Sequence, residues 1–160
     1  MTQKSQYSIA RATIAGLIAT AGLALSLAAG VASAQTPQQA IQFRKGSMQV
    51  QQWHLRTLVQ MIKGQRPFDA AVYLRAMTTL ESLAASVGEG FIPGSDTGDT
   101  RTMPDAFKDP AAFRAAVERF QGEAKKAVAV ARSGDEKAMR AEVPEMIKAC
   151  DGCHERFRSK

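Results

Sequence analysis

Apolar residues recur at intervals of three and four along most of residues 35–160, which is the period of an amphipathic helix. Four segments show this spacing, and none of them alternates apolar and polar residues as a half-buried strand does. The pattern therefore predicts an all-α domain. The stripe of the first segment is the least uniform, because Arg44 lies among Ile41, Met48, Leu55, Leu58, Val59 and Ile62.

Residues that begin and end helices bound the first two segments. Thr36, Pro37 and Gln39 predict a capping box around a proline at the first helical position. Gly64 is placed to end this helix in a left-handed conformation, and Asp69 is a candidate N-cap for the second helix. The second helix then ends in a glycine-rich stretch.

The last two segments carry the same kind of signals. Asp109 and Pro110 predict the start of the third helix, and Gly134 predicts its end. The fourth helix can start at either Ser133 or Asp135. Four amphipathic helices joined by two short links and one long link predict an antiparallel four-helix bundle.

Two features depart from simple helices. Residues 88–109 contain repeated glycines and prolines, and we interpret this break as a crossover between two helices, with a direct role at a functional site as the alternative. Pro144 lies inside the fourth apolar stripe and removes a backbone hydrogen bond. We expect it to bend this helix without ending it.

The N-terminal residues 1–34 have the composition of a secretory signal peptide. Lys4 and Arg11 precede an apolar run over residues 14–31, and Ala-Ser-Ala follows at positions 32–34. We expect cleavage after this tripeptide, which leaves residues 35–160 as the exported domain, in the periplasm and without a membrane anchor. An uncleaved N-terminal anchor is the alternative, and it also exports the domain.

The charge of the chain bears on its partners. The formal net charge of +6 falls to +4 without Lys4 and Arg11. No basic stripe is interleaved with aromatic residues, so nucleic acid is not an expected partner. The mild excess of positive charge favours encounter with an acidic protein or an anionic surface.

The only two cysteines of the chain, Cys150 and Cys153, are followed by His154 in the spacing C-x-x-C-H. This spacing is the attachment signature of a c-type haem. The thiols form thioethers with the haem vinyl groups, and the histidine ligates the iron. On a helix, residues three and four apart share one face, so one face can hold the haem at three points.

Three other uses of these residues are less consistent with the chain. A dithiol oxidoreductase needs its C-x-x-C at a helix N-terminus, where the dipole lowers the thiol pKa, whereas this motif lies late in a helix. A structural zinc site needs four ligands, and beyond the motif only His54 adds a further histidine. A disulfide across two residues closes a very small loop and adds little stability.

Three further residues are candidates for the haem environment. Met48 lies on the first apolar stripe, where its thioether is either a sixth iron ligand or an ordinary core side chain. Arg44 points the same way, and its guanidinium is suited either to a haem propionate or to solvent. Arg158 follows His154 by four residues, which places it beside the histidine ring or leaves it an exposed cation. His54 is expected at the edge of its helix.

The chain resembles the cytochrome c′ family, the class II c-type cytochromes, over residues 38–159. Unlike class I cytochromes c, it has the haem motif at its C-terminal end. The resemblance rests on Arg-Lys-x-x-Met at 44–48, Lys-Gly-Gln-x-Pro-Phe-Asp at 63–69, Gly-Asp-Thr-Arg at 98–101, the motif at 150–154, and Phe-Arg at 157–158.

The resemblance implies an antiparallel bundle with one covalent haem c on its C-terminal helix, and a homodimer through the first two helices. It assigns the thioethers to Cys150 and Cys153 and the axial iron bond to His154. Arg44 then contacts a propionate, and Arg158 lies beside the proximal histidine. Met48 occupies the opposite face, where the family has either an apolar shield over five-coordinate iron or a methionine ligand.

These implications lead to an expected function. We expect a periplasmic electron-transfer protein that exchanges electrons with redox partner proteins and, if its iron is five-coordinate, binds nitric oxide or carbon monoxide. The alternatives are a low-spin carrier with Met48 bound to iron and a protein that sequesters nitric oxide. We do not expect an enzyme, because Met48 is not an acid–base group.

Overall fold

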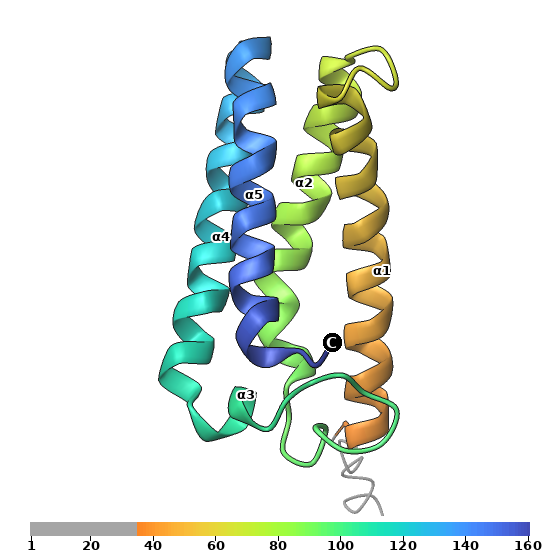
Figure 1. Ribbon diagram of the computed structural model, residues 1–160, viewed down its shortest axis with the longest axis vertical. Coiled ribbons are helices and arrows are strands. Elements are labelled where there is room, and N and C mark those ends of the chain that lie inside the picture. The colour runs from red at the N-terminus through yellow and green to blue at the C-terminus, as the bar shows by residue number, and fades with distance from the viewer. Residues whose placement is uncertain (1–34) are drawn as a thin grey trace, which may run out of the picture. The chain divides into compact units, whose positions relative to one another are not determined.

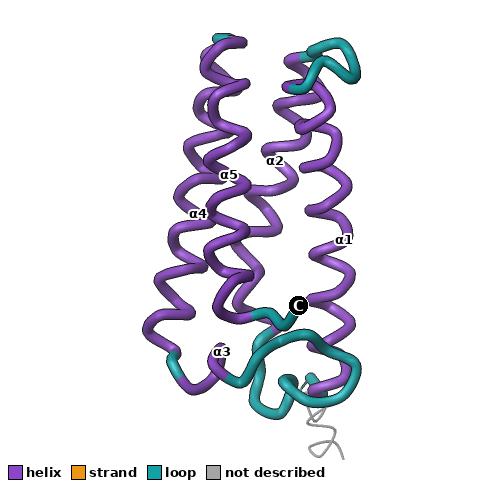
Figure 2. The backbone as a smooth tube through the Cα atoms, in the orientation of Figure 1, coloured by secondary structure: helices purple, strands orange, loops and turns teal. Residues whose placement is uncertain are grey.

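The computed structural model describes residues 35–160, and the predicted signal peptide lies outside these residues. Four long helices run antiparallel along one axis (Figures 1 and 2). They are α1 (Pro37–Ile62), α2 (Ala70–Ser86), α4 (Pro110–Ser133) and α5 (Glu136–Phe157), and two short elements, a 3₁₀ helix (Val87–Gly90) and α3 (Asp105–Lys108), interrupt the crossover. The predicted all-α, antiparallel four-helix bundle is therefore confirmed.

The helix ends follow the local signals in the sequence. The Thr36 hydroxyl accepts a hydrogen bond from the Gln39 amide at 3.2 Å, and the Gln39 side chain accepts one from the Thr36 amide at 2.8 Å. Asp69 and Asp109 each accept from the amide three residues on. At the start of α5, Asp135 caps the helix in the same way, so the choice between Ser133 and Asp135 is resolved.

The core lies between α2, α4 and α5 and is formed by alanine, methionine, valine and aromatic side chains. Among its fully buried members are Tyr73, Met77, Ala124, Ala127, Met139 and Val143. Helix α5 runs without interruption through Pro144. Within residues 35–160, no helix has both the length and the apolar character needed to cross a membrane.

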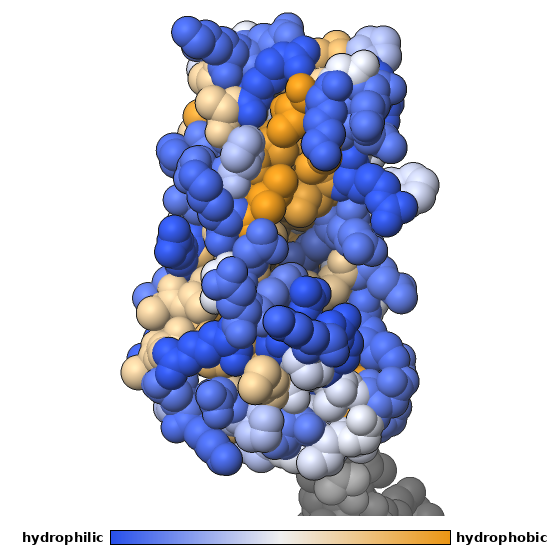
Figure 3. All heavy atoms as spheres, viewed as in Figure 1, coloured by the Kyte–Doolittle hydropathy of each residue, from blue (hydrophilic) through white to orange (hydrophobic). Residues whose placement is uncertain are grey.

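The inner face of α1 differs from the predicted stripe. Ser47 and Gln51 are buried with exposed fractions of 8% and 7%, whereas Leu55, Val59 and Ile62 are only half-buried. Apolar side chains are accordingly visible along the upper half of the molecular face in Figure 3. The face of α1 that points inward is therefore more polar than an apolar stripe predicts.

The crossover is not a simple connection. An isolated antiparallel bridge pairs Thr102 with Arg158, just beyond the end of α5. Two backbone hydrogen bonds extend this pairing, from Met103 to the Phe157 carbonyl at 2.9 Å and from Ser159 to the Arg101 carbonyl at 2.8 Å. The crossover therefore packs under the C-terminal end of α5.

Candidate functional site

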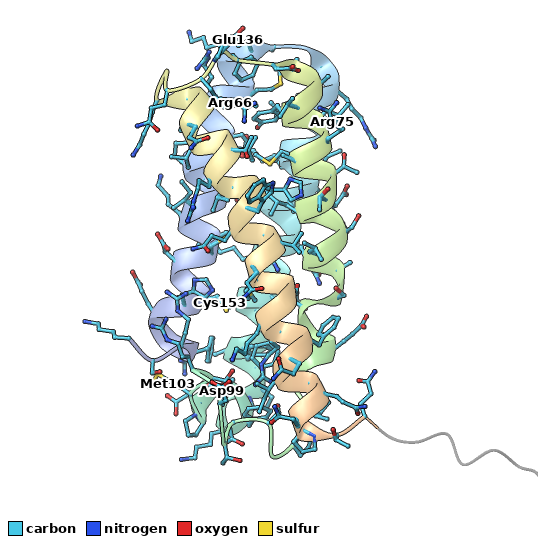
Figure 4. The ribbon with its side chains drawn as sticks, turned by 90° about the vertical axis from the view of Figure 1, so that its right-hand side faces the viewer. Arg66, Arg75, Asp99, Met103, Glu136 and Cys153 are labelled. Atoms are coloured by element: carbon cyan, nitrogen blue, oxygen red, sulfur yellow. The ribbon has the colours of Figure 1, made fainter. Side chains whose placement is uncertain are left out.

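The C-x-x-C-H motif occupies the last two turns of α5. Cys150, Cys153 and His154 are all half-buried, and both cysteines are free. Figure 4 shows Cys153 between α5 and α1, with Asp99 of the crossover below it. The motif thus faces the space between the first and last helices of the bundle.

A cavity of about 400 Å³ opens at this position. Its volume lies within the range of about 300–1,000 Å³ that is usual for cofactor and ligand sites. It is walled by α1, the 3₁₀ helix and the rest of the crossover, and the end of α5. Its lining residues are Arg44, Lys45, Met48, Gln49, Val87, Phe91, Asp99, Thr100, Arg101, Thr102, Cys153, His154, Phe157 and Arg158.

A smaller cavity of about 30 Å³ lies deeper in the bundle and shares part of this wall. Cys153, His154 and Met48 line both cavities. Mostly apolar side chains enclose the deeper one, and Gln51 is a polar lining residue that does not belong to the motif. Its remaining lining residues are Val87, Ala116, Val117, Phe120, Ala149 and Cys150. The site is therefore apolar inside and charged at its outer edge.

The pKa shifts of the cysteine and histidine side chains in the motif are consistent with a haem attachment site. Burial, together with the positive charge of Arg158, lowers the pKa of His154, so that its ring is neutral at pH 7 and able to ligate a metal. Burial and the neighbouring Asp151 raise the pKa of Cys150 to about 11. Burial also raises the pKa of Cys153. Both thiols are therefore protonated at neutral pH, unlike the thiols of a dithiol oxidoreductase.

The outer edge of the larger cavity carries several basic side chains. Lys45, Arg101 and Arg158 are exposed there. Lys45 forms an ion pair with Asp99 at 2.5 Å, and the Arg101 guanidinium donates to the Ser159 carbonyl at 2.6 Å. A haem placed with its apolar edge inward presents its propionates to this edge, so the donor set and the charges fit the cofactor.

Arg44 is buried and holds the crossover against α1. Its two terminal nitrogens donate to the Gly90 carbonyl, to the carbonyl and the hydroxyl of Ser95, and to the Thr100 hydroxyl. Burial lowers the pKa of this guanidinium. Of its five N–H donors, only the one on Nε is not used in these bonds, so the predicted propionate contact depends on this group.

The crossover also approaches α1 very closely at Gly90. A Cβ atom built at this position lies 2.5 Å from Arg44 Cγ and 2.9 Å from Phe43 Cδ1. Only glycine therefore fits here. Because Asp99, Thr100 and Arg101 of the crossover line the cavity, the interpretation of this segment as a plain connection is wrong, and it forms part of the site.

Met48 and His54 are placed as their helix positions indicate. Met48 lines both cavities and faces the motif from α1. His54 is half-buried and lines neither cavity. Within residues 35–160, no three side chains of the types His, Cys, Asp and Glu come together as a group that could hold a metal ion.

The apolar pattern of the chain predicts neither the buried Gln51 nor the bonds by which Arg44 holds the crossover. A signal for Gln51 was present, because Arg44, Ser47 and Gln51 follow one another at spacings of three and four and continue the inner stripe. No comparable signal pointed to the crossover partners of Arg44.

An antiparallel helical bundle with this motif in the wall of a deep apolar cavity defines a haem protein of the c type. Comparison with known proteins narrows this class. The family model for cytochrome c′ matches residues 39–158. The cytochrome c′ of Rubrivivax gelatinosus is 32% identical, over 79% of this chain and 98% of that protein. The chain therefore belongs to the cytochrome c′ family.

Solved structures of this family superpose well on the bundle. The structure of the Rubrivivax gelatinosus protein, which covers 78% of this chain and 98% of that one, gives a TM-score of 0.74 at 32% identity. Two structures from Alcaligenes xylosoxidans each cover 78% of this chain and 98% of their own. A carbon monoxide-bound variant has a TM-score of 0.72 at 29% sequence identity. A nitric oxide complex of a mutant has a TM-score of 0.71 at 30% sequence identity.

Membership of the family confirms the predicted cofactor, one covalently attached haem c. When bound, the haem would supply a one-electron iron couple and a coordination position for a small ligand, with His154 as the residue that would hold its iron. The roles of Cys150, Cys153 and His154 as attachment and ligand residues stay predictions that the cavity geometry supports. The same holds for Arg158 and Met48, which line this cavity. The geometry does not favour the predicted propionate contact of Arg44, because four of its five N–H donors bond to the crossover.

Proposed function

We propose that this protein binds nitric oxide or carbon monoxide at its haem iron and also carries electrons. The observation that carries the proposal is the wall opposite His154. Among the described residues that line the two cavities, Met48 is the one that faces the motif from α1 with a side chain able to ligate iron. A thioether is a weak ligand, so this position is either open or displaceable by a diatomic gas.

The relatives support gas binding. The superposed structures from Alcaligenes xylosoxidans include one with carbon monoxide and one with nitric oxide. The apolar inner end of the cavity favours a small uncharged ligand over an anion, because an anion loses its hydration there without gaining a charged partner. The proposal therefore does not depend on the fold alone.

The test is an optical spectrum of the holoprotein, ferric and ferrous, before and after addition of carbon monoxide. A broad ferrous spectrum that carbon monoxide changes supports an open position. A sharp, split ferrous spectrum that becomes broad in Met48→Ala indicates a methionine ligand, which carbon monoxide must then displace for the proposal to hold. Ferrous protein that binds neither carbon monoxide nor nitric oxide contradicts the proposal.

Electron transfer is a second function that the charges at the cavity edge favour. Arg101 and Arg158 line the mouth of the cavity, where Asp99 pairs with Lys45, and residues 35–160 carry a formal net charge of +4. This net positive charge attracts an acidic redox partner, and screening by salt weakens the attraction. We expect the rate of reduction by an acidic donor protein to fall as ionic strength rises, and a rate independent of salt contradicts this role.

We further propose export to the periplasm, with cleavage after residue 34, and assembly as a homodimer. Phe43, Val50 and Trp53 are exposed to 42%, 44% and 72%, and their spacing places them on one outer face of α1. Sedimentation of the wild type and of Trp53→Glu tests the dimer, and the wild type sedimenting as a monomer contradicts it.

We infer a role without substrate turnover, because neither Met48 nor Gln51, which face the motif, titrates.

A further inference from the structure

Gln51 is a polar side chain buried in a cavity wall that is otherwise mostly apolar. Its exposed fraction is 7%, and it lines the deeper cavity together with Cys150, Cys153 and His154. Burying a primary amide costs free energy unless it finds hydrogen-bond partners. Its position across the cavity from the motif therefore needs an explanation.

Only part of the amide is used inside the protein. Gln51 Nε2 donates to Ser47 Oγ at 3.1 Å, and Ser47 lies one turn earlier on the same helix. A glutamine amide has two N–H donors and an accepting oxygen. Within the described residues, this one bond leaves the second N–H group without an acceptor. That hydrogen atom remains for a molecule that enters the cavity.

The deeper cavity has room for a small molecule. Its volume of about 30 Å³ exceeds the roughly 10–15 Å³ that a cavity needs to hold one water molecule. Met48 lies three residues before Gln51 and lines the same cavity, so both side chains project from the same side of α1. A group attached to the motif therefore has His154 on its α5 side and these two residues on its α1 side.

We propose that the Gln51 amide donates a hydrogen bond to a diatomic gas held on the α1 side of the haem. Ser47 acts as a positioning residue, because its hydroxyl holds the amide in place. The inference rests on the proposed gas binding and adds to it the residue that sets how long the ligand stays bound. A buried donor that is already positioned stabilises the bound gas without first having to be ordered.

The test compares ferrous carbon monoxide complexes of the wild-type holoprotein, Gln51→Leu, Gln51→Met and Gln52→Leu. The leucine variant keeps a similar volume, the methionine variant keeps an unbranched side chain of similar length, and neither has a hydrogen-bond donor. Gln52→Leu makes the same chemical change at an exposed neighbour that lines neither cavity. Infrared spectroscopy reads the C–O stretching frequency, which a hydrogen-bond donor lowers, and flash photolysis with ligand exchange reads the dissociation rate.

We expect both Gln51 variants to raise the C–O stretching frequency and to speed carbon monoxide dissociation about fivefold to tenfold, the equivalent of one hydrogen bond. Ser47→Ala should broaden the C–O band, because the amide is then held less firmly. Gln52→Leu should match the wild type. Equal frequencies and rates in the wild type and the Gln51 variants overturn this inference alone, whereas a wild type that binds neither gas overturns the proposed function as well.

Discussion

Replacing Arg44 with methionine should loosen the crossover and weaken the whole bundle. Methionine is unbranched and apolar, so it replaces the aliphatic stem of Arg44 but removes every donor to the crossover, together with the guanidinium that lies over the Phe91 ring. Three of the abandoned acceptors, the Gly90 carbonyl and the two oxygens of Ser95, belong to buried residues that water does not easily reach. The variant therefore loses bonds that water does not replace.

The expected loss follows from these acceptors. Each buried acceptor left without a partner costs roughly 1 kcal/mol or more, and the Thr100 hydroxyl is half-exposed and contributes less. The free energy of unfolding should then fall by about 3 kcal/mol. With a urea m value of about 2 kcal/mol/M, this shifts the unfolding midpoint by roughly 1.5 M.

Lys45→Met provides the matched control. It makes the same replacement at the next residue and removes the same charge. It also breaks a contact with the crossover, but Lys45 and Asp99 are 45% and 78% exposed, so this ion pair is worth less than about 1 kcal/mol. Urea unfolding of the two holoprotein variants measures the difference, and amide exchange over residues 91–100 localises it. Equal midpoints for both variants refute the reasoning.

Three further predictions concern other parts of the bundle. Gly90→Ala should destabilise the protein and disturb the cavity. Gly88→Ala should do neither, because a Cβ atom at Gly88 meets nothing within 4 Å. Thermal unfolding of both variants measures the difference, and equal melting temperatures contradict the prediction. Tyr73→Phe should leave stability unchanged or raise it by about 1 kcal/mol in urea unfolding, because the fully buried hydroxyl has no hydrogen-bond partner among the described residues, and a clear loss contradicts this. The pKa of Asp109 is lowered, first by the hydrogen bond from the amide that it caps at the start of α4 and then by Arg156. The contribution of the ionised Asp109 to the free energy of unfolding is therefore present above the ordinary aspartate pKa. It is lost as the pH falls through the lowered pKa. Asp109→Asn should therefore be less stable than the wild type at pH 7 and equally stable near pH 2, and a gap that persists in acid contradicts the assignment.

The bundle could be predicted from sequence because its signals are local. A capping residue such as Asp69 satisfies an amide three residues away, and that bond needs nothing from the rest of the chain. The apolar stripes of α2, α4 and α5 likewise require only a helix and a core to face. The motif at Cys150–His154 is local in the same sense, and it indicated the cofactor before any packing was known.

The features of the site that could not be predicted from the sequence depend on contacts between residues far apart along the chain. The partners of Arg44 lie 46 to 56 residues away along the chain, and no periodicity encodes such a distance. The shape of the crossover, including the short helix α3, follows from these contacts. Gln51 was overlooked for a different reason, because a search for apolar residues does not recognise a buried polar side chain on an inner face.

The bridge between the crossover and the C-terminal tail has a consequence for the order of folding. Residues that close it, such as Arg101 and Ser159, are 58 positions apart, whereas each helix forms from neighbours within a turn. Closing a long loop costs chain entropy before any contact across the loop offsets that cost, so such contacts form late. We therefore expect the helices to assemble first, and the floor of the cavity to close behind a haem that is already attached.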